Sequence, residues 1–113
     1  MPYLKAPPLA TDEVEAYGLP TVSSEEGTLF DHCLRAIERG TTVGAHGLPL
    51  FGAGDWNDGM NRVGEAGRGE STWLGFFLHG VLSDFAALCD RRDDDVRAER
   101  YRAEARRLEA QLE

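Results

Sequence analysis

One stretch of the chain, GLPLFGAGDWNDGMNRVG (residues 47–64), concentrates side chains that can do chemistry. It combines carboxylates, amides, an indole and a guanidinium: Asp55, Trp56, Asn57, Asp58, Asn61 and Arg62. Sugar hydroxyls need bidentate polar partners, and the apolar face of a pyranose ring stacks on tryptophan. This composition is therefore typical of a carbohydrate site.

A carboxyl group beside an indole can have its acid form favoured, because a partly dehydrated environment disfavours the charged form. A general acid that protonates a glycosidic oxygen requires that state. From composition alone, an equally strong alternative is a turn in which the Asp and Asn side chains cap backbone N–H groups. That alternative is preferred for Asp55, which follows Gly54, and Trp56 could equally be a core residue.

Arg62 and Glu70 are ambiguous in the same way. Asn57 and Arg62 are expected to bind substrate together with Trp56, and Asn61 is expected to brace the loop together with Asp55. From the residues alone, an ion pair that braces the loop is the stronger interpretation for Arg62 and Glu70.

Other kinds of site fit the spacing less well. The segment GAGDWN lacks the third glycine of a dinucleotide-binding fingerprint, and a P-loop lysine is missing. A calcium loop would require glycine where Met60 stands. His32, His46 and His79 do not form a metal-binding spacing, so we expect structural histidines and no metal or cofactor.

The elements that must position this stretch are helical. Apolar spacing predicts a helix over 28–39, capped by Thr28 with Asp31, and two more over 71–91 and 94–113. Residues 1–27 contain several prolines and no period, which indicates an extended lead. Residues 40–70 form a long glycine-rich loop. The fold class expected is all-α.

The predicted helix over 71–91 is apolar nearly all round, which indicates burial on every side. The predicted helix over 94–113 has only a narrow apolar stripe, typical of an outer, half-exposed helix. Together with one more amphipathic helix it cannot cover the apolar one. We therefore expect either self-association through this surface or further helices of a larger domain.

Composition excludes several partners. The 113 residues carry a net charge of −8, which disfavours nucleic acid and anionic membranes. No apolar run reaches the roughly 18 residues that span a bilayer. The start, MPYLKAPPLATDE, lacks the apolar stretch of a signal peptide. Cys33 and Cys89 are expected to be buried thiols, so the cytoplasm is the expected compartment.

The sequence resembles glycoside hydrolase family 94, the inverting β-glucoside phosphorylases, and within it the C-terminal phosphorylase-like domain of cyclic β-1,2-glucan synthases. The resemblance rests on TLFDHCLRAIERG, GAHGLPLFGAGDWNDGMNRVG, GRGESTWLGFFLHGVL and an APPL segment. It implies that residues 1–113 are part of an (α/α)6 toroid, with 71–91 an inner helix and 94–113 an outer one. The parent enzyme would lie in the cytoplasm or be anchored in the inner membrane.

The resemblance also implies the chemistry. Asp58 matches the family's general acid, and Trp56 matches the residue that lines the donor sugar subsite. Inorganic phosphate would be the nucleophile and co-substrate, so a second catalytic carboxylate is not needed. The family's phosphate-binding residues match nothing in this chain. The isolated 113 residues are therefore expected to be inactive, and a non-catalytic helical interaction module or a sugar-binding module is the alternative function.

Overall fold

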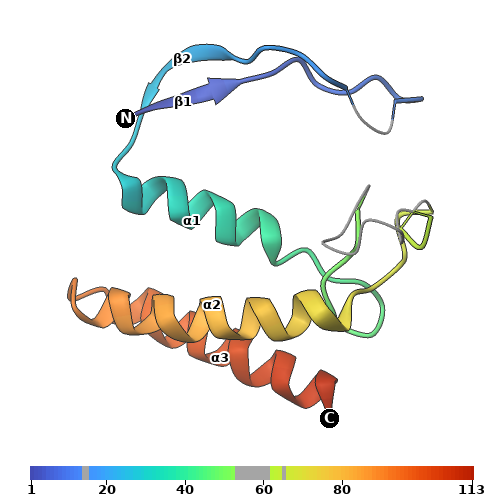
Figure 1. Ribbon diagram of the computed structural model, residues 1–113. Helices are drawn as coiled ribbons and strands as arrows, with labels where there is room; N and C mark the ends of the chain where they lie inside the picture. Colours follow the sequence, from blue (N-terminus) through green and yellow to red (C-terminus); the bar gives the residue numbers. More distant parts are fainter. Residues whose placement is uncertain (14–15, 53–61, 65) are drawn as a thin grey trace. The chain divides into compact units, whose positions relative to one another are not determined.

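The computed structural model describes residues 1–113 apart from 14–15, 53–61 and 65 (Figure 1). The elements, in chain order, are β1 (Pro2–Lys5), β2 (Thr21–Glu26), α1 (Leu29–Gly40), α2 (Thr72–Asp90) and α3 (Asp95–Leu112). They fall into two compact units, Met1–Arg39 and Gly40–Glu113. The three helices lie where the apolar spacing predicts them, with ends close to the predicted ones.

The first unit contains a β-hairpin that the sequence analysis did not predict. Strands β1 and β2 pair antiparallel, with Leu4 opposite Val22 and Lys5 opposite Thr21. The chain is therefore not all-α, and residues 1–27 are more than an extended lead. The two strands are short and far apart in sequence, so local periodicity carried no signal of their pairing. Pro2 is tolerated because it is the first residue of its strand.

Helix α1 begins at the predicted cap. The Thr28 backbone N–H donates to Asp31 Oδ2 (2.8 Å), and the Asp31 N–H donates back to Thr28 Oγ1 (3.2 Å). On this unit the Tyr3 ring stacks on His32 at 4.0 Å between centroids, and the Arg35 guanidinium lies 3.7 Å from the Tyr3 ring centroid. Arg35 also pairs with Glu25 (3.3 Å). Aromatic and cationic contacts of this kind fasten β1 to α1.

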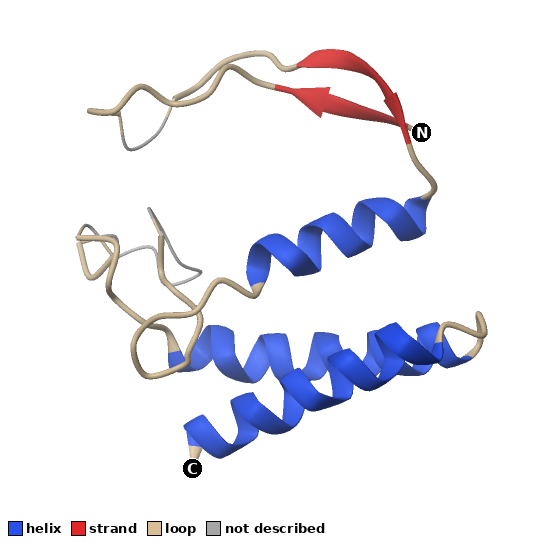
Figure 2. Ribbon diagram, turned by 180° about the vertical axis from the view of Figure 1, so that it is seen from behind, coloured by secondary structure: helices blue, strands red, loops and turns tan. Residues whose placement is uncertain are grey.

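The second unit is built on an antiparallel pair of helices, α2 and α3, that lie side by side in both views (Figures 1 and 2). Asp94 caps α3 by accepting a hydrogen bond from the Arg97 N–H (3.2 Å), and it also pairs with the Arg97 side chain. In the turn, Asp93 adopts a left-handed conformation with φ of 58°. The Asp94 N–H donates to the Cys89 carbonyl (3.0 Å), which closes the end of α2.

The core of this unit lies between the two helices. Its buried side chains come from one face of each helix: Leu78, Leu82, Ala86 and Cys89 from α2, and Ala98, Tyr101, Ala105 and Leu108 from α3. The narrow apolar stripe predicted for α3 is thus its contact face. Glu104 and Arg107, three residues apart, pair on its solvent side (2.6 Å).

Within the described residues α2 is not buried on every side, which agrees with the expectation that the other helices of this chain cannot cover it; its burial by further helices or by self-association stays a prediction. Trp73, Phe76 and Phe77 are 44%, 65% and 56% exposed. Trp73 and Phe77 stack on each other with centroids 5.8 Å apart. Helix α3 is a single partner and covers a single face, so the other apolar face of α2 stays open within the described residues.

By length and composition alone, α2 could also cross a membrane, with a mean hydropathy of 1.3. This differs from the expectation, which counted uninterrupted apolar runs, whereas an average tolerates His79 and Asp84. A core helix of a soluble protein meets the same criterion, so the finding is weak.

Candidate functional site

Five of the six predicted site residues lie outside the described part of the chain: Asp55, Trp56, Asn57, Asp58 and Asn61. The sixth, Arg62, is exposed in a turn. The structure describes the base of the loop on either side of this stretch, residues 41–52, 62–64 and 66–71. The site is therefore built from that base upward.

Three short segments of the loop are joined by backbone hydrogen bonds. The first two form a tight hairpin, in which the Leu50 N–H donates to the Thr42 carbonyl (3.1 Å) and the Gly44 N–H to the Leu48 carbonyl (2.9 Å). Gly47 turns this hairpin with φ of +80°, a conformation that favours glycine. Predicted as a loop, this region therefore contains bridged backbone, with Val43 opposite Pro49.

The third segment closes the loop by pairing with the second. The Phe51 N–H donates to the Gly69 carbonyl, and the Ser71 N–H donates to the Pro49 carbonyl, both at 2.8 Å. Leu50 and Glu70 thus face each other in an antiparallel bridge. These backbone hydrogen bonds join the segment before residues 53–61 to the segment that follows them, without help from side chains.

The glycines Gly64 and Gly69 permit this closure. A Cβ atom on Gly64 would collide with the Gly52 carbonyl oxygen and lie 2.8 Å from the Phe51 Cβ. A Cβ atom on Gly69 would collide with the Val63 carbonyl. Backbone meets backbone at both positions, so neither neighbour can yield cheaply. The glycine content noted in the sequence has a structural reason here.

The Glu70 side chain fastens the base from inside. One carboxylate oxygen accepts a hydrogen bond from the His46 backbone N–H (2.8 Å) and the other from the Leu48 N–H (3.3 Å). The His46 ring nitrogen Nδ1 lies 3.5 Å from the same carboxylate, whose side chain is 8% exposed. The predicted bracing role of Glu70 is thus seen, with backbone amides and His46 as its partners.

The electrostatics of Glu70 follow from these contacts. The hydrogen bond from the His46 N–H lowers the pKa of the Glu70 carboxyl below its ordinary value of 4.5. Burial opposes this shift, and the Leu48 N–H and the His46 ring lower the pKa further. The carboxylate is therefore ionised at neutral pH, so both of its oxygens are acceptors.

The loop base is attached directly to the start of α2. Ser71, 2% exposed, caps this helix by accepting a hydrogen bond from the Leu74 N–H (3.1 Å). Leu48 is buried, and a Cβ atom on Gly75 would lie 3.4 Å from its Cδ2 atom. The orientation of the loop base is thus set by the first turn of α2.

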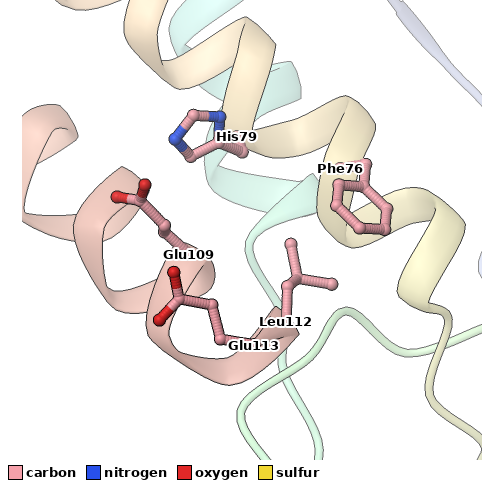
Figure 3. Close-up of a pocket in the computed structure, with 5 residues that line it drawn as sticks. All are labelled: Phe76, His79, Glu109, Leu112 and Glu113. Carbon is pink, nitrogen blue, oxygen red and sulfur yellow. The ribbon is translucent and has the colours of Figure 1, made fainter.

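A separate pocket lies between α2 and α3, with a volume of about 270 Å³ (Figure 3). Its lining combines apolar side chains with a histidine and carboxylates: Phe76, His79, Leu112, Glu109 and Glu113. Within the described residues, no three His, Cys, Asp or Glu side chains gather closely enough to hold a metal ion.

The two cysteines differ in environment. Cys89 is buried, and burial raises the pKa of its thiol, while Cys33 is half-buried. The expectation of a buried thiol is confirmed for Cys89, and Cys33 is more accessible than expected.

Sequence reasoning identified Glu70 as a bracing residue but missed His46 and Gly44 as its partners. His46 contributes mainly its backbone N–H, which every residue but proline possesses, so its residue type does not indicate this contact. For Gly44, the reason for glycine appears only when the Glu70 carboxylate is seen against it.

Comparisons with known proteins agree with the sequence resemblance. The family model for the glycosyl hydrolase 94 superfamily, catalytic domain, matches residues 1–113. Over its whole length the chain is 41% identical to the cyclic β-(1,2)-glucan synthase NdvB of Rhizobium meliloti (strain 1021). Over 76% of its length it is 42% identical to the 3-O-β-D-glucopyranosyl-β-D-glucuronide phosphorylase of Paenibacillus borealis. Cellobionic acid phosphorylase of Neurospora crassa is 33% identical over 74% of the chain.

The chain spans a small part of these relatives: 4% of the synthase and 11% of each phosphorylase. The match nevertheless includes the whole of the glycine-rich loop and its base, because the family model extends over every residue of the chain. The chain belongs to the glycosyl hydrolase 94 superfamily and lies in its catalytic domain.

Proposed function

We propose that this chain carries the general acid of an enzyme that acts on β-1,2-glucans, by inverting phosphorolysis or in the control of glucan chain length. The acid is Asp58, with Trp56, Asn57 and Arg62 binding the sugar and Asp55 and Asn61 bracing the loop. The observation that carries the proposal is the family match over residues 1–113, which includes the DWND motif.

The mechanism is a single displacement. The Asp58 carboxyl gives its proton to the glycosidic oxygen while a phosphate oxygen attacks the anomeric carbon from the opposite face. The carbon–oxygen bond breaks, the shortened glucan leaves as an alcohol, and glucose 1-phosphate forms with inverted configuration. Phosphate is already a charged nucleophile, so the base that an inverting hydrolase needs to activate water is not required. No cofactor takes part.

One structural feature and one comparison support this assignment. Backbone hydrogen bonds hold together the two ends of the stretch that carries Asp58, as a catalytic loop requires. The relatives include a cyclic β-(1,2)-glucan synthase and a phosphorylase of a β-D-glucopyranosyl glucuronide. The proposed location is the cytoplasm, either free or on the cytoplasmic side of the inner membrane.

The remainder of the catalytic domain is the proposed partner of α2. Three exposed aromatic side chains (Trp73, Phe76 and Phe77) lie together on this helix, and a contiguous apolar patch is typical of an interaction surface. Relatives are many times longer than this chain and so contain further segments that could cover it. Phosphate-binding groups would come from that remainder, so the 113 residues alone are expected to release no glucose 1-phosphate.

The test is glucose 1-phosphate release from linear β-1,2-glucan and phosphate by the protein in its full native reading frame. Because general-acid assistance is worth about 10²–10⁴-fold, Asp58→Asn should reduce turnover by that factor while glucan affinity changes little. Asp12→Asn, at an exposed position outside the loop, is the matched control and should retain most of the turnover. Equal turnover of Asp58→Asn and the wild type would sink the assignment of Asp58.

The second candidate function is a non-catalytic interaction module, favoured by the same exposed face of α2. Self-association through this face would then accompany binding without turnover. This second function would be favoured if the well-folded full-length protein binds glucan but releases no glucose 1-phosphate, and if Asp58→Asn behaves in the same way.

A further inference from the structure

We propose that Glu70 is the positioning residue of this site: its carboxylate locks the base of the loop and so fixes where the stretch that carries the catalytic acid begins and ends. The inference rests on the proposed function for its catalytic consequence. Its structural part concerns described residues alone.

Glu70 contacts several segments of the loop base at once. The Glu70 backbone faces Leu50 in the bridge that closes the loop. Its carboxylate reaches past that segment to the hairpin turn and accepts the His46 and Leu48 N–H groups there. A single residue thus ties together the closing segment, the central segment and the turn.

The hydrogen bonds to the Glu70 carboxylate are of a strong kind. A carboxylate that accepts backbone N–H groups makes charge-assisted hydrogen bonds, roughly twice as strong as neutral ones. The Glu70 side chain is 8% exposed, so little water is available to replace them. Loss of the acceptor would leave the His46 and Leu48 amides without this partner, and Leu48 is a buried residue.

The third step is Gly44, which lies where the carboxylate must fit. A Cβ atom there would collide with the Glu70 side chain, touching its Oε1, Cδ and Cγ atoms. Gly44 has no left-handed φ that would require glycine for its own sake. Its lack of a side chain is therefore explained by the space that the Glu70 carboxylate occupies.

The fourth step connects the base to the chemistry. In sequence, the segments that Glu70 joins lie on either side of residues 53–61, and the described chain before and after them is paired by the hydrogen bond from the Phe51 N–H to the Gly69 carbonyl. A displacement of about 1 Å at a reacting group can cost about 10²-fold in rate. Because the Glu70 carboxylate accepts hydrogen bonds from backbone amides, we infer that it acts by positioning the loop rather than by contacting the substrate.

The experiment compares Glu70→Gln and Gly44→Ala in the protein in its full native reading frame. The first removes one of two anionic acceptors, and the second displaces the carboxylate while leaving it chemically intact. We expect faster hydrogen exchange of peptides from 44–52 and 62–71 in both variants. The kcat for phosphorolysis should fall by up to about 10²-fold, with KM for glucan changed by less than about threefold.

Two further measurements separate positioning from general loss of structure. The double variant should be no slower than the slower single variant, because both substitutions remove the same interaction. Glu99→Gln, which removes a carboxylate from an exposed pair with Arg106, and Gly18→Ala, where a Cβ atom meets open space, are the matched controls and should behave as wild type.

The outcomes decide between the inference and the proposed function. Unchanged exchange at the loop base, or faster exchange with unchanged kcat, overturns the positioning role. If Asp58→Asn retains full turnover, the proposed acid is wrong instead. If the wild type releases no glucose 1-phosphate, the exchange of peptides spanning 44–71 decides alone: faster exchange in both variants supports the lock, and unchanged exchange overturns it.

Discussion

The helix pair α2–α3 and the loop base at its end are held together by different forces. Between the helices, the contact consists of apolar side chains, with Leu82 and Cys89 fully buried and Leu108 almost so. In the loop base, backbone N–H and carbonyl groups pair across three segments, and one buried carboxylate accepts two more N–H groups. The first contact is broad and non-directional, whereas the second depends on a few directed bonds.

The difference shows how stability and precision are divided in this chain. Apolar burial tolerates small shifts because its energy scales with area. Directed hydrogen bonds do not tolerate them, because their strength falls steeply with angle. The helix pair therefore serves as the support, and the loop base sets position. Ser71 joins the two regions, since it caps α2 and also donates to Pro49.

The largest predicted effect tests the apolar region. Leu82→Ala should lower the free energy of unfolding by about 2–5 kcal/mol, because Leu82 is 0% exposed and the cavity would be lined by neighbours that relax only in part. Urea denaturation of the protein in its full native reading frame measures this cost. Val96→Ala on α3 is the control, since Val96 is 83% exposed and should change stability by less than about 0.5 kcal/mol. Equal costs for the two variants would contradict the core assignment.

A smaller effect is predicted at the junction. Ser71→Ala should cost about 1 kcal/mol, because the Leu74 N–H loses its capping acceptor. Ser83→Ala is the matched control: its hydroxyl donates to the His79 carbonyl on an exposed part of the same helix, so alanine there should be neutral or slightly stabilising. Hydrogen exchange at the first turn of α2 should rise in Ser71→Ala alone. If both serine variants lose the same stability, the cap does not connect helix and loop.

The smallest predicted effect is the pH dependence of the loop base. The pKa of Glu70 is lowered in the folded state, so its contribution is complete above its ordinary value of 4.5 and is lost as the pH falls through the lower folded value. Wild type and Glu70→Gln should therefore differ in exchange at 44–52 near neutral pH, and the difference should shrink as the pH falls below 4.5 and disappear only below the lower folded pKa of Glu70. Asp94 also has a lowered pKa but is present in both proteins. If the difference in exchange between wild type and Glu70→Gln instead grows as the pH falls, the pKa of Glu70 is not lowered by folding.

How far the sequence predicted the fold depended on the range of the interactions involved. Helix α1 was found from Thr28, Asp31 and its apolar face, because caps and periodicity act within a few residues. The hairpin of β1 and β2 was missed because its pairing joins residues that are distant in sequence, such as Leu4 and Val22. The uncovered face of α2 was expected from its all-round apolar composition, but composition does not show which element covers which face.

The candidate site divides in the same way. Its chemistry was readable from residue types, and the motif around Asp58 identified the family that the comparisons confirm. The roles of Asp58, Trp56, Asn57, Asp55 and Asn61 stay predictions, since these residues lie outside the described part of the chain. Glu70 was recognised as a bracing residue, but its partners were not.

The sequence by itself determined the three helices, the Thr28 cap of α1 and the family, because each depends on local spacing or on a motif of adjacent residues. Only the tertiary structure decided which face of α2 is covered, and which backbone amides the Glu70 carboxylate accepts. It also decided why Gly44, Gly64 and Gly69 must lack side chains. These features depend on atoms that chain folding brings together from distant positions, and such proximity leaves no local pattern in the sequence.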